Sequence, residues 1–428
     1  MMKTHGNVLA AALLLGGCAE ATDKGAAPQR LYRGYAAFTL KLGQSDNAEA
    51  VKLIPSSDLA LLSSSKAKKA TLVRIDGETL VELRSRALFA DDPSESELTN
   101  VEVGPAGEWA VFTRTLETRD AAGKQTSCGG EVVFVDITDS AAFGTVLQRV
   151  TVGPMPDSVD VSSDGRWVVV ANERDSAWGG KCEVAGVSPS ISIIDVTNGV
   201  GLAHERQRVT MPPDATDGRE PESIVFSRDD DLVVCTLQDS HEVALLRLSA
   251  LAGLSALSSQ DLQVVRLPQN SLGQDPWPDN IVAFADQSGA EYFAIAGEWN
   301  DTLIVIDGTG AVVANVDIDA RDMPSDLPRD ASGEAPPFRP DSLTKFQVDG
   351  HSYLAASLKH AGAVGIWDVS AADAPTFAEV IKIGKEDAGT PTTASTVGGE
   401  GVAASADGSA IVCANEGEGS LSLILPRP

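Results

Sequence analysis

The sequence predicts an all-β protein, a seven-bladed β-propeller closed by an N-terminal strand that completes the last blade. Three observations support this fold class: a strand pattern that recurs seven times, turn signals between its strands, and a spare strand at the N-terminus. A period of roughly 40 to 60 residues with three or four short strands per copy is typical of propellers. We therefore expect residues 32–428 to form one closed ring of blades.

Each copy of the pattern starts with an acidic or amide residue, followed by three apolar runs separated by turns. The runs are short and rich in β-branched residues, which favours strands over helices. Turn signals such as Asp164-Gly165 and Asp407-Gly408 separate first from second runs, as a tight hairpin needs. The seven copies begin at Glu49, Asn100, Asp157, Glu222, Asp279, Asp341 and Glu400.

The two ends of the chain predict how the ring closes. The last copy reaches the C-terminus after its third run, so its outer strand is missing. The segment 33–42 precedes the first copy and has strand character. We expect residues 33–42 to pair with residues 419–426, because this pairing removes an exposed sheet edge.

The N-terminus has the features of a secretory signal. Residues 1–17 contain Lys3, an apolar run too short to span a bilayer, and small residues. The end of this run, Leu-Gly-Gly-Cys18, resembles the bacterial lipobox, and the resemblance implies that Cys18 is lipidated and becomes the mature N-terminus. Residues 18–31 would then be a lipidated flexible tether. The alternative is a plain secretory signal that ends near a Cys by chance.

Charge and location limit the partners. The chain has 33 Lys and Arg against 61 Asp and Glu, a net charge of -28. Such a charge argues against nucleic acid and against docking on anionic lipid through a basic patch. We expect a protein of the bacterial cell envelope, on the periplasmic or cell-surface face, that contacts the membrane only through its lipid anchor. Its partner would be an extracellular or periplasmic protein, a glycan or a small ligand.

The acidic residues that begin the copies and the polar residues at the ends of the second runs should meet on one face of the ring. In a propeller, the loops that enter first strands share a face with the loops that join second to third strands. Carboxylates crowded there need a cation or an Arg among them, and Ca²⁺ suits oxygen ligands. The alternative is that these acids cap turns, and their repetition in six copies favours that role. The candidate metal or cation ligands are Asp157, Asn172, Glu222, Asp279, Asp341 and Glu400.

The cysteines of the ring fall into two classes. Cys128 and Cys182 lie in long second-to-third-strand loops of neighbouring copies, so we expect a disulfide between them, which an exported protein can keep. Cys235 and Cys413 occupy equivalent positions in second runs and should be buried and inert. The sequence lacks a CxxC pair, a GxSxG elbow, an HExxH motif and a P-loop, and no catalytic residue is predicted.

Several strings resemble a known family. The segments PDSVDVSSDGRWVVVANERD, SISIIDVTNG and GEGVAASADGSAIVCANEGEGSLSLI are similar to the choice-of-anchor I β-propellers, and more loosely to YVTN-type surface propellers. The resemblance implies a propeller that is secreted or attached to the surface, and it leaves the activity open. Many relatives carry a C-terminal anchor, whereas this chain has the N-terminal lipobox-like Cys18.

Two functions are consistent with these features. The first is a non-enzymatic binding or scaffold module that uses its loop-rich acidic face. The second is a calcium-dependent hydrolase of lactones or phosphate esters, in which carboxylates hold the metal at the channel mouth and the metal acts as a Lewis acid. Apart from Ca²⁺ in the second case, the sequence predicts no cofactor.

Overall fold

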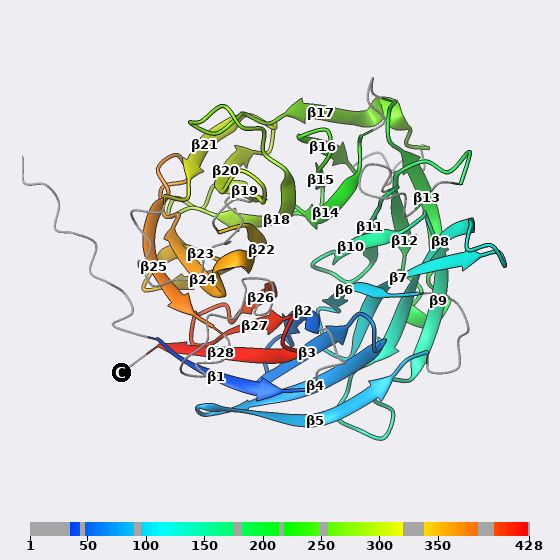
Figure 1. Ribbon diagram of the computed structural model, residues 1–428, viewed down its shortest axis with the longest axis horizontal. Helices are drawn as coiled ribbons and strands as arrows, with labels where there is room; N and C mark the ends of the chain where they lie inside the picture. Colours follow the sequence, from blue (N-terminus) through cyan, green and yellow to red (C-terminus); the bar gives the residue numbers. More distant parts are fainter. Residues whose placement is uncertain are drawn as a thin grey trace, which may run out of the picture.

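The computed structural model describes residues 35–42, 48–89, 96–174, 182, 184–213, 218–248, 256–319, 338–383 and 398–426. Their strands form seven four-stranded antiparallel sheets that surround a central channel as blades (Figure 1). The predicted seven-bladed all-β propeller is therefore confirmed. The proposed signal peptide, Cys18 and the tether lie outside the described residues. Within the described part, no helix has the length and apolar character needed to cross a membrane.

The first four blades follow each other along the chain. Blade 1 contains β2 (Ala48–Leu53), β3 (Leu59–Ser64), β4 (Lys69–Asp76) and β5 (Thr79–Ala87). Blade 2 contains β6 (Leu98–Val103), β7 (Trp109–Arg119), β8 (Gln125–Asp136) and β9 (Val146–Val152). Blade 3 contains β10 (Pro156–Val161), β11 (Trp167–Asn172), β12 (Ser190–Asp195) and β13 (His204–Thr210). Blade 4 contains β14 (Pro221–Phe226), β15 (Leu232–Leu237), β16 (Glu242–Arg247) and β17 (Leu262–Arg266).

The remaining blades complete the ring. Blade 5 contains β18 (Pro278–Ala285), β19 (Glu291–Gly297), β20 (Thr302–Asp307) and β21 (Val312–Asp317). Blade 6 contains β22 (Pro340–Val348), β23 (His351–Leu358), β24 (Ala363–Asp368) and β25 (Thr376–Lys382). Blade 7 contains β26 (Gly399–Ala404), β27 (Ile411–Asn415), β28 (Ser420–Pro426) and β1 (Tyr35–Lys41). The described helices are short 3-10 turns, η1 (Val200–Leu202), η2 (Ser259–Asp261) and η3 (Lys359–Ala361).

The two ends of the chain close the ring as predicted. Strand β1 pairs antiparallel with β28, from Tyr35 opposite Pro426 to Lys41 opposite Ser420. Figure 1 shows the dark blue β1 beside the red β28. Gly401 of blade 7 lies so close to blade 1 that a Cβ atom there would be 2.8 Å from the carbonyl oxygen of Glu49. This close approach requires a residue without a side chain.

The hydrophobic core is divided among the gaps between neighbouring blades. Among the residues that the structure describes, seven buried apolar clusters are present, and each joins residues of two adjacent blades. Middle strands such as β15 are buried along their whole length, whereas outer strands such as β13 alternate between exposed and less exposed residues. The pattern follows from the architecture, since a middle strand is covered on both faces and an outer strand meets solvent. The free Cys235 and Cys413 are buried in β15 and β27, as expected.

A bulge near the start of each first strand determines which side chains can face the channel. In β14, for example, the pairing with β15 shifts register between Pro221 and Ile224, and the same shift occurs after the first residue of every first strand. A bulge leaves residues unpaired and redirects their side chains. The residue that directly follows the first strand residue is therefore equivalent in all blades.

These seven equivalent residues, here named the entry ring, confirm six of the seven predicted copy starts. In blade 2 the ring position belongs to Thr99, not to Asn100, because the register places Asn100 one residue further along the strand. The prediction for this copy was wrong by one residue, since a single sequence does not show where a bulge begins. The entry ring is Glu49, Thr99, Asp157, Glu222, Asp279, Asp341 and Glu400.

Candidate functional site

Hydrogen bonds between blades hold the entry ring in place. The serine that follows Asp157 or Glu222 binds the next blade: the Ile224 amide donates to Ser158 Oγ at 3.3 Å, and the Ile281 amide donates to Ser223 Oγ at 3.3 Å. Buried Thr236 of blade 4 donates through Oγ1 to the Asp279 carbonyl at 2.7 Å. These contacts show that serine and threonine side chains next to the ring bind backbone groups between blades. They fix the backbone of the acids and leave the carboxyl groups directed at the channel.

A second ring of side chains lies beside the entry ring, at the ends of the second strands. A repeated backbone hydrogen bond places it: the Glu173 amide donates to the Met155 carbonyl at 3.0 Å, and the Glu298 amide donates to the Trp277 carbonyl at 2.9 Å. The two rings therefore share one end of the channel, here called the acidic mouth. This second-strand ring is Ser65, Thr115, Glu173, Gln238, Glu298, Lys359 and Glu416.

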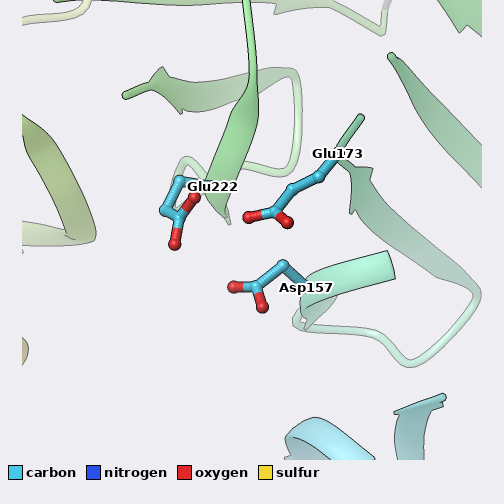
Figure 2. Close-up of side chains that lie close together, drawn as sticks. All are labelled: Asp157, Glu173 and Glu222. Atoms are coloured by element: carbon cyan, nitrogen blue, oxygen red, sulfur yellow. The ribbon is translucent and has the colours of Figure 1, made fainter. Parts of the chain in front are cut away.

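Three carboxyl groups converge on the side of blades 3 and 4. One oxygen from each of Asp157, Glu173 and Glu222 lies within 4.8 Å of the other two. Figure 2 shows the three carboxyl groups turned toward a common space. Burial raises the pKa of Glu222 well above its ordinary value, and the charges of Glu173 and Asp157 raise it further. Such a cluster favours either a shared proton or a cation between its oxygens.

A second cluster with the same spacing lies on blades 5 and 6. Oxygens of Asp279, Glu298 and Asp341 are also mutually within 4.8 Å. Here the protein supplies cations of its own, because Arg339 donates from Nε to Glu298 at 2.5 Å and Lys359 Nζ lies 3.4 Å from Asp341. These cations lower the pKa of Glu298, but burial, which raises it, has the larger effect.

The third group of acids lies where blade 7 meets blade 1. Lys359 donates to Glu400 at 2.5 Å. Burial raises the pKa of Glu49 to about 8, and the neighbouring Glu416 raises it as well, whereas a hydrogen bond with Ser65 opposes the shift. At neutral pH this carboxyl group is therefore largely protonated in the folded protein.

The entry ring and four members of the second-strand ring line a cavity of about 1420 Å³ that runs along the channel; these four are Glu173, Gln238, Glu298 and Lys359. Its far end has mixed charge: Lys52 Nζ lies 2.7 Å from Glu102, and Lys345 donates to the Ala283 carbonyl. Burial and the charge of Glu102 raise the pKa of Asp160 there to about 7. The strong negative charge of the cavity is therefore confined to the acidic mouth.

Aromatic side chains complete the wall of the acidic mouth on blade 5. Trp277 directly precedes β18, Trp299 follows Glu298, and their ring centroids are 6.3 Å apart. The guanidinium carbon of Arg339 lies 4.6 Å from the centroid of the Trp299 ring. The Arg339 backbone has a left-handed φ of 53°, and the buried carboxylate of Asp301 accepts its amide at 2.7 Å.

The structure brings five of the six predicted ligand candidates into the cavity wall, namely Asp157, Glu222, Asp279, Asp341 and Glu400. The sixth, Asn172, is fully buried inside blade 3, where its amide nitrogen donates to Ser190 O and Ser192 Oγ at 3.0 Å. Its side chain is not part of the cavity wall, which its neighbour Glu173 joins instead.

The predicted disulfide is present. Cys128 of β8 and Cys182, in the segment after β11, are bonded with their Cα atoms 5.7 Å apart, and the bond joins blade 2 to blade 3. It therefore braces two neighbouring blades on the side that carries Asp157 and Glu173.

The sequence showed that the second strands end in polar residues, but the predicted ligand candidates did not include Glu173, Glu298 or Lys359. Their signal was their equivalent position at the end of each second run. Arg339 was missed altogether. Only its place two residues before the entry acid Asp341 could have indicated a role at the mouth.

Comparison with known proteins supports the fold. Residues 55–213 match the choice-of-anchor I domain. The match spans most of blade 1 and all of blades 2 and 3, and it includes Asp157, Glu173 and both disulfide cysteines. No curated protein matches the sequence.

Among solved structures, the chain is similar to virginiamycin B lyase from Staphylococcus aureus, with a TM-score of 0.57, 12% identity, and coverage of 92% of this chain and 99% of that chain. It is also similar to hydrazine synthase from Kuenenia stuttgartiensis, with a TM-score of 0.57, 14% identity, and coverage of 90% and 97%. At these identities the likeness shows the propeller fold alone.

Proposed function

We propose that this protein is a surface-anchored β-propeller that acts as a binding module and takes a cationic ligand at its acidic mouth. One observation carries the proposal: eight carboxyl groups of the two rings line the cavity, whereas Arg339 and Lys359 are the cations on the same rim. A positive ligand lowers the repulsion among these groups, and the field of the mouth would draw it in.

The first test is calcium binding by calorimetry on chelator-treated protein, with a parallel thermal melt. We expect binding by the wild type and at least tenfold weaker binding by the double variant Asp157→Asn, Glu222→Gln. The control is Glu78→Gln, which removes an exposed acid of the β4–β5 turn. If neither calcium nor an organic cation binds, or if the double variant binds as well as the wild type, the proposal is wrong.

A second candidate function is a calcium-dependent hydrolase, and the two carboxylate triads are the observation that favours it. A metal held by Asp157, Glu173 and Glu222 would polarise a carbonyl or phosphoryl oxygen. Calcium-dependent turnover of lactones or phosphate esters that is lost in the double variant would support this function. Calcium binding without turnover would contradict the hydrolase and support the binding module.

We also propose that Cys18 carries the lipid that anchors the protein in the bacterial cell envelope. The lipobox-like string before Cys18 supports this proposal. Labelling with a fatty-acid analogue should be lost in Cys18→Ser, and the variant should leave the membrane fraction. Equal labelling of both proteins would contradict the proposal.

A further inference from the structure

The wall of the acidic mouth contains more than oxygen ligands. Trp277 and Trp299 line the same cavity as the carboxyl groups, and each side chain is only partly buried. His241 extends this aromatic group, with its ring centroid 5.3 Å from that of Trp277. Indole rings offer no ligand atom to a hard metal ion. They do offer a surface for apolar carbon and for organic cations.

Arg339 shows what this wall can hold. Its guanidinium group lies against the face of Trp299, and its Nε atom donates to the Glu298 carboxylate. The cavity therefore already accommodates one organic cation between an aromatic ring and a carboxylate, supplied by the protein itself. Cation–π contacts of this kind add to the attraction of a nearby carboxylate.

The triad of Asp157, Glu173 and Glu222 has a geometry that suits an ammonium group. Three acceptors placed about 2.8 Å from one tetrahedral nitrogen lie about 4.6 Å apart. The three carboxyl oxygens lie within 4.8 Å of one another, a limit that includes this spacing. After burial, the charges of Glu173 and Asp157 have the largest effects in raising the pKa of Glu222. A positive charge placed among these three carboxyl groups would therefore be stabilised.

The size of the cavity favours a ligand larger than a bare ion. About 1420 Å³ is far more than one metal ion fills, and the cavity wall is continuous from the triad to the two indole rings. The carboxyl groups between the triad and the indole rings also interact, because the charges of Glu222 and Glu298 both raise the pKa of Asp279. A ligand with a charged end and an apolar body would contact both parts of the wall.

We propose that the acidic mouth binds a primary alkylammonium ligand, with its nitrogen among Asp157, Glu173 and Glu222 and its carbon chain against Trp277 and Trp299. This inference rests on the proposed function, since it names the chemical class of the cationic ligand. The ammonium group donates one hydrogen bond to each carboxyl group. The carbon chain removes apolar surface from water as it lies along the indole rings.

The test is calorimetry with methylammonium, butylammonium and hexylammonium chloride at neutral pH, with butan-1-ol as the uncharged control. We expect affinity to rise about twofold to fourfold for each added methylene, and we expect no binding of butan-1-ol. Trp277→Leu and Trp299→Leu should abolish the dependence on chain length, whereas the exposed control Glu78→Gln should leave it unchanged. Thermal melts of both variants verify that they are folded.

The outcomes separate this inference from the function on which it rests. Equal affinities for methylammonium and hexylammonium, or a chain-length dependence that persists in both tryptophan variants, would overturn the alkylammonium proposal. Calcium binding that depends on the triad without any ammonium binding would also overturn it, while the cation-binding function would stand. If the double variant Asp157→Asn, Glu222→Gln binds calcium and ammonium as well as the wild type does, both the alkylammonium proposal and the cation-binding function are contradicted.

Discussion

Replacing Glu49 by Gln should stabilise the protein at neutral pH, because this acid is held in an environment that disfavours its charge. Its pKa is raised from 4.5 to about 8 by burial and by Glu416. In the unfolded chain the group is ionised at pH 7, whereas in the fold it keeps a proton. The folded state therefore binds more protons, and its stability falls as pH rises from about 4.5 to about 8.

The magnitude follows from that pH interval. Each pH unit between the unfolded pKa of 4.5 and the assay pH costs about 1.4 kcal/mol, so at pH 7 Glu49 destabilises the fold by up to about 3 kcal/mol. An amide at this position does not ionise and can still bind Ser65. The variant should gain up to that amount at pH 7 and nothing below pH 4.5.

The assay is the melting temperature of wild type and Glu49→Gln measured from pH 4.5 to pH 8, in the presence of chelator. Glu78→Gln is the matched control, since Glu78 is exposed in the same blade. The difference between Glu49→Gln and wild type should grow with pH, and the control should show no such trend. A stabilisation that is the same at every pH, or a destabilised variant at pH 7, would refute the reasoning.

Two further predictions concern other contacts of the same face. Glu298→Gln should lower the free energy of unfolding by about 3 kcal/mol, because it leaves the partly buried Arg339 without its main carboxylate partner. Denaturant unfolding would measure this change. An unchanged free energy of unfolding would contradict the prediction and show that Arg339 pairs with another acid. Cys128→Ser, Cys182→Ser should cost about 2 to 4 kcal/mol, because the bond closes a sequence separation of 54 residues. Wild type under reducing conditions should melt like this double variant, and a melting temperature insensitive to both changes would contradict the role of the disulfide.

The repeat and its closure were readable from the sequence. Short alternating runs with turn signals require strands at regular intervals, and a missing outer strand at one end requires a partner from the other. The pairing of Cys128 with Cys182 was also predictable, since equivalent loops of adjacent blades must be neighbours. These features depend only on local pattern and on the symmetry of a closed ring.

The composition of the mouth was decided by tertiary structure. A bulge in each first strand selects Thr99 over Asn100 and directs Glu222 into the channel. Asn172 and Glu173 are adjacent in sequence, yet one is buried in blade 3 and the other joins the acidic mouth, because successive strand residues face opposite sides. The position of Arg339 against Glu298 depends on two neighbouring blades, and no local pattern specifies such a contact. The sequence by itself determined that acids repeat around a ring, and only the packing of seven blades decided which of them meet one another and which meet a cation.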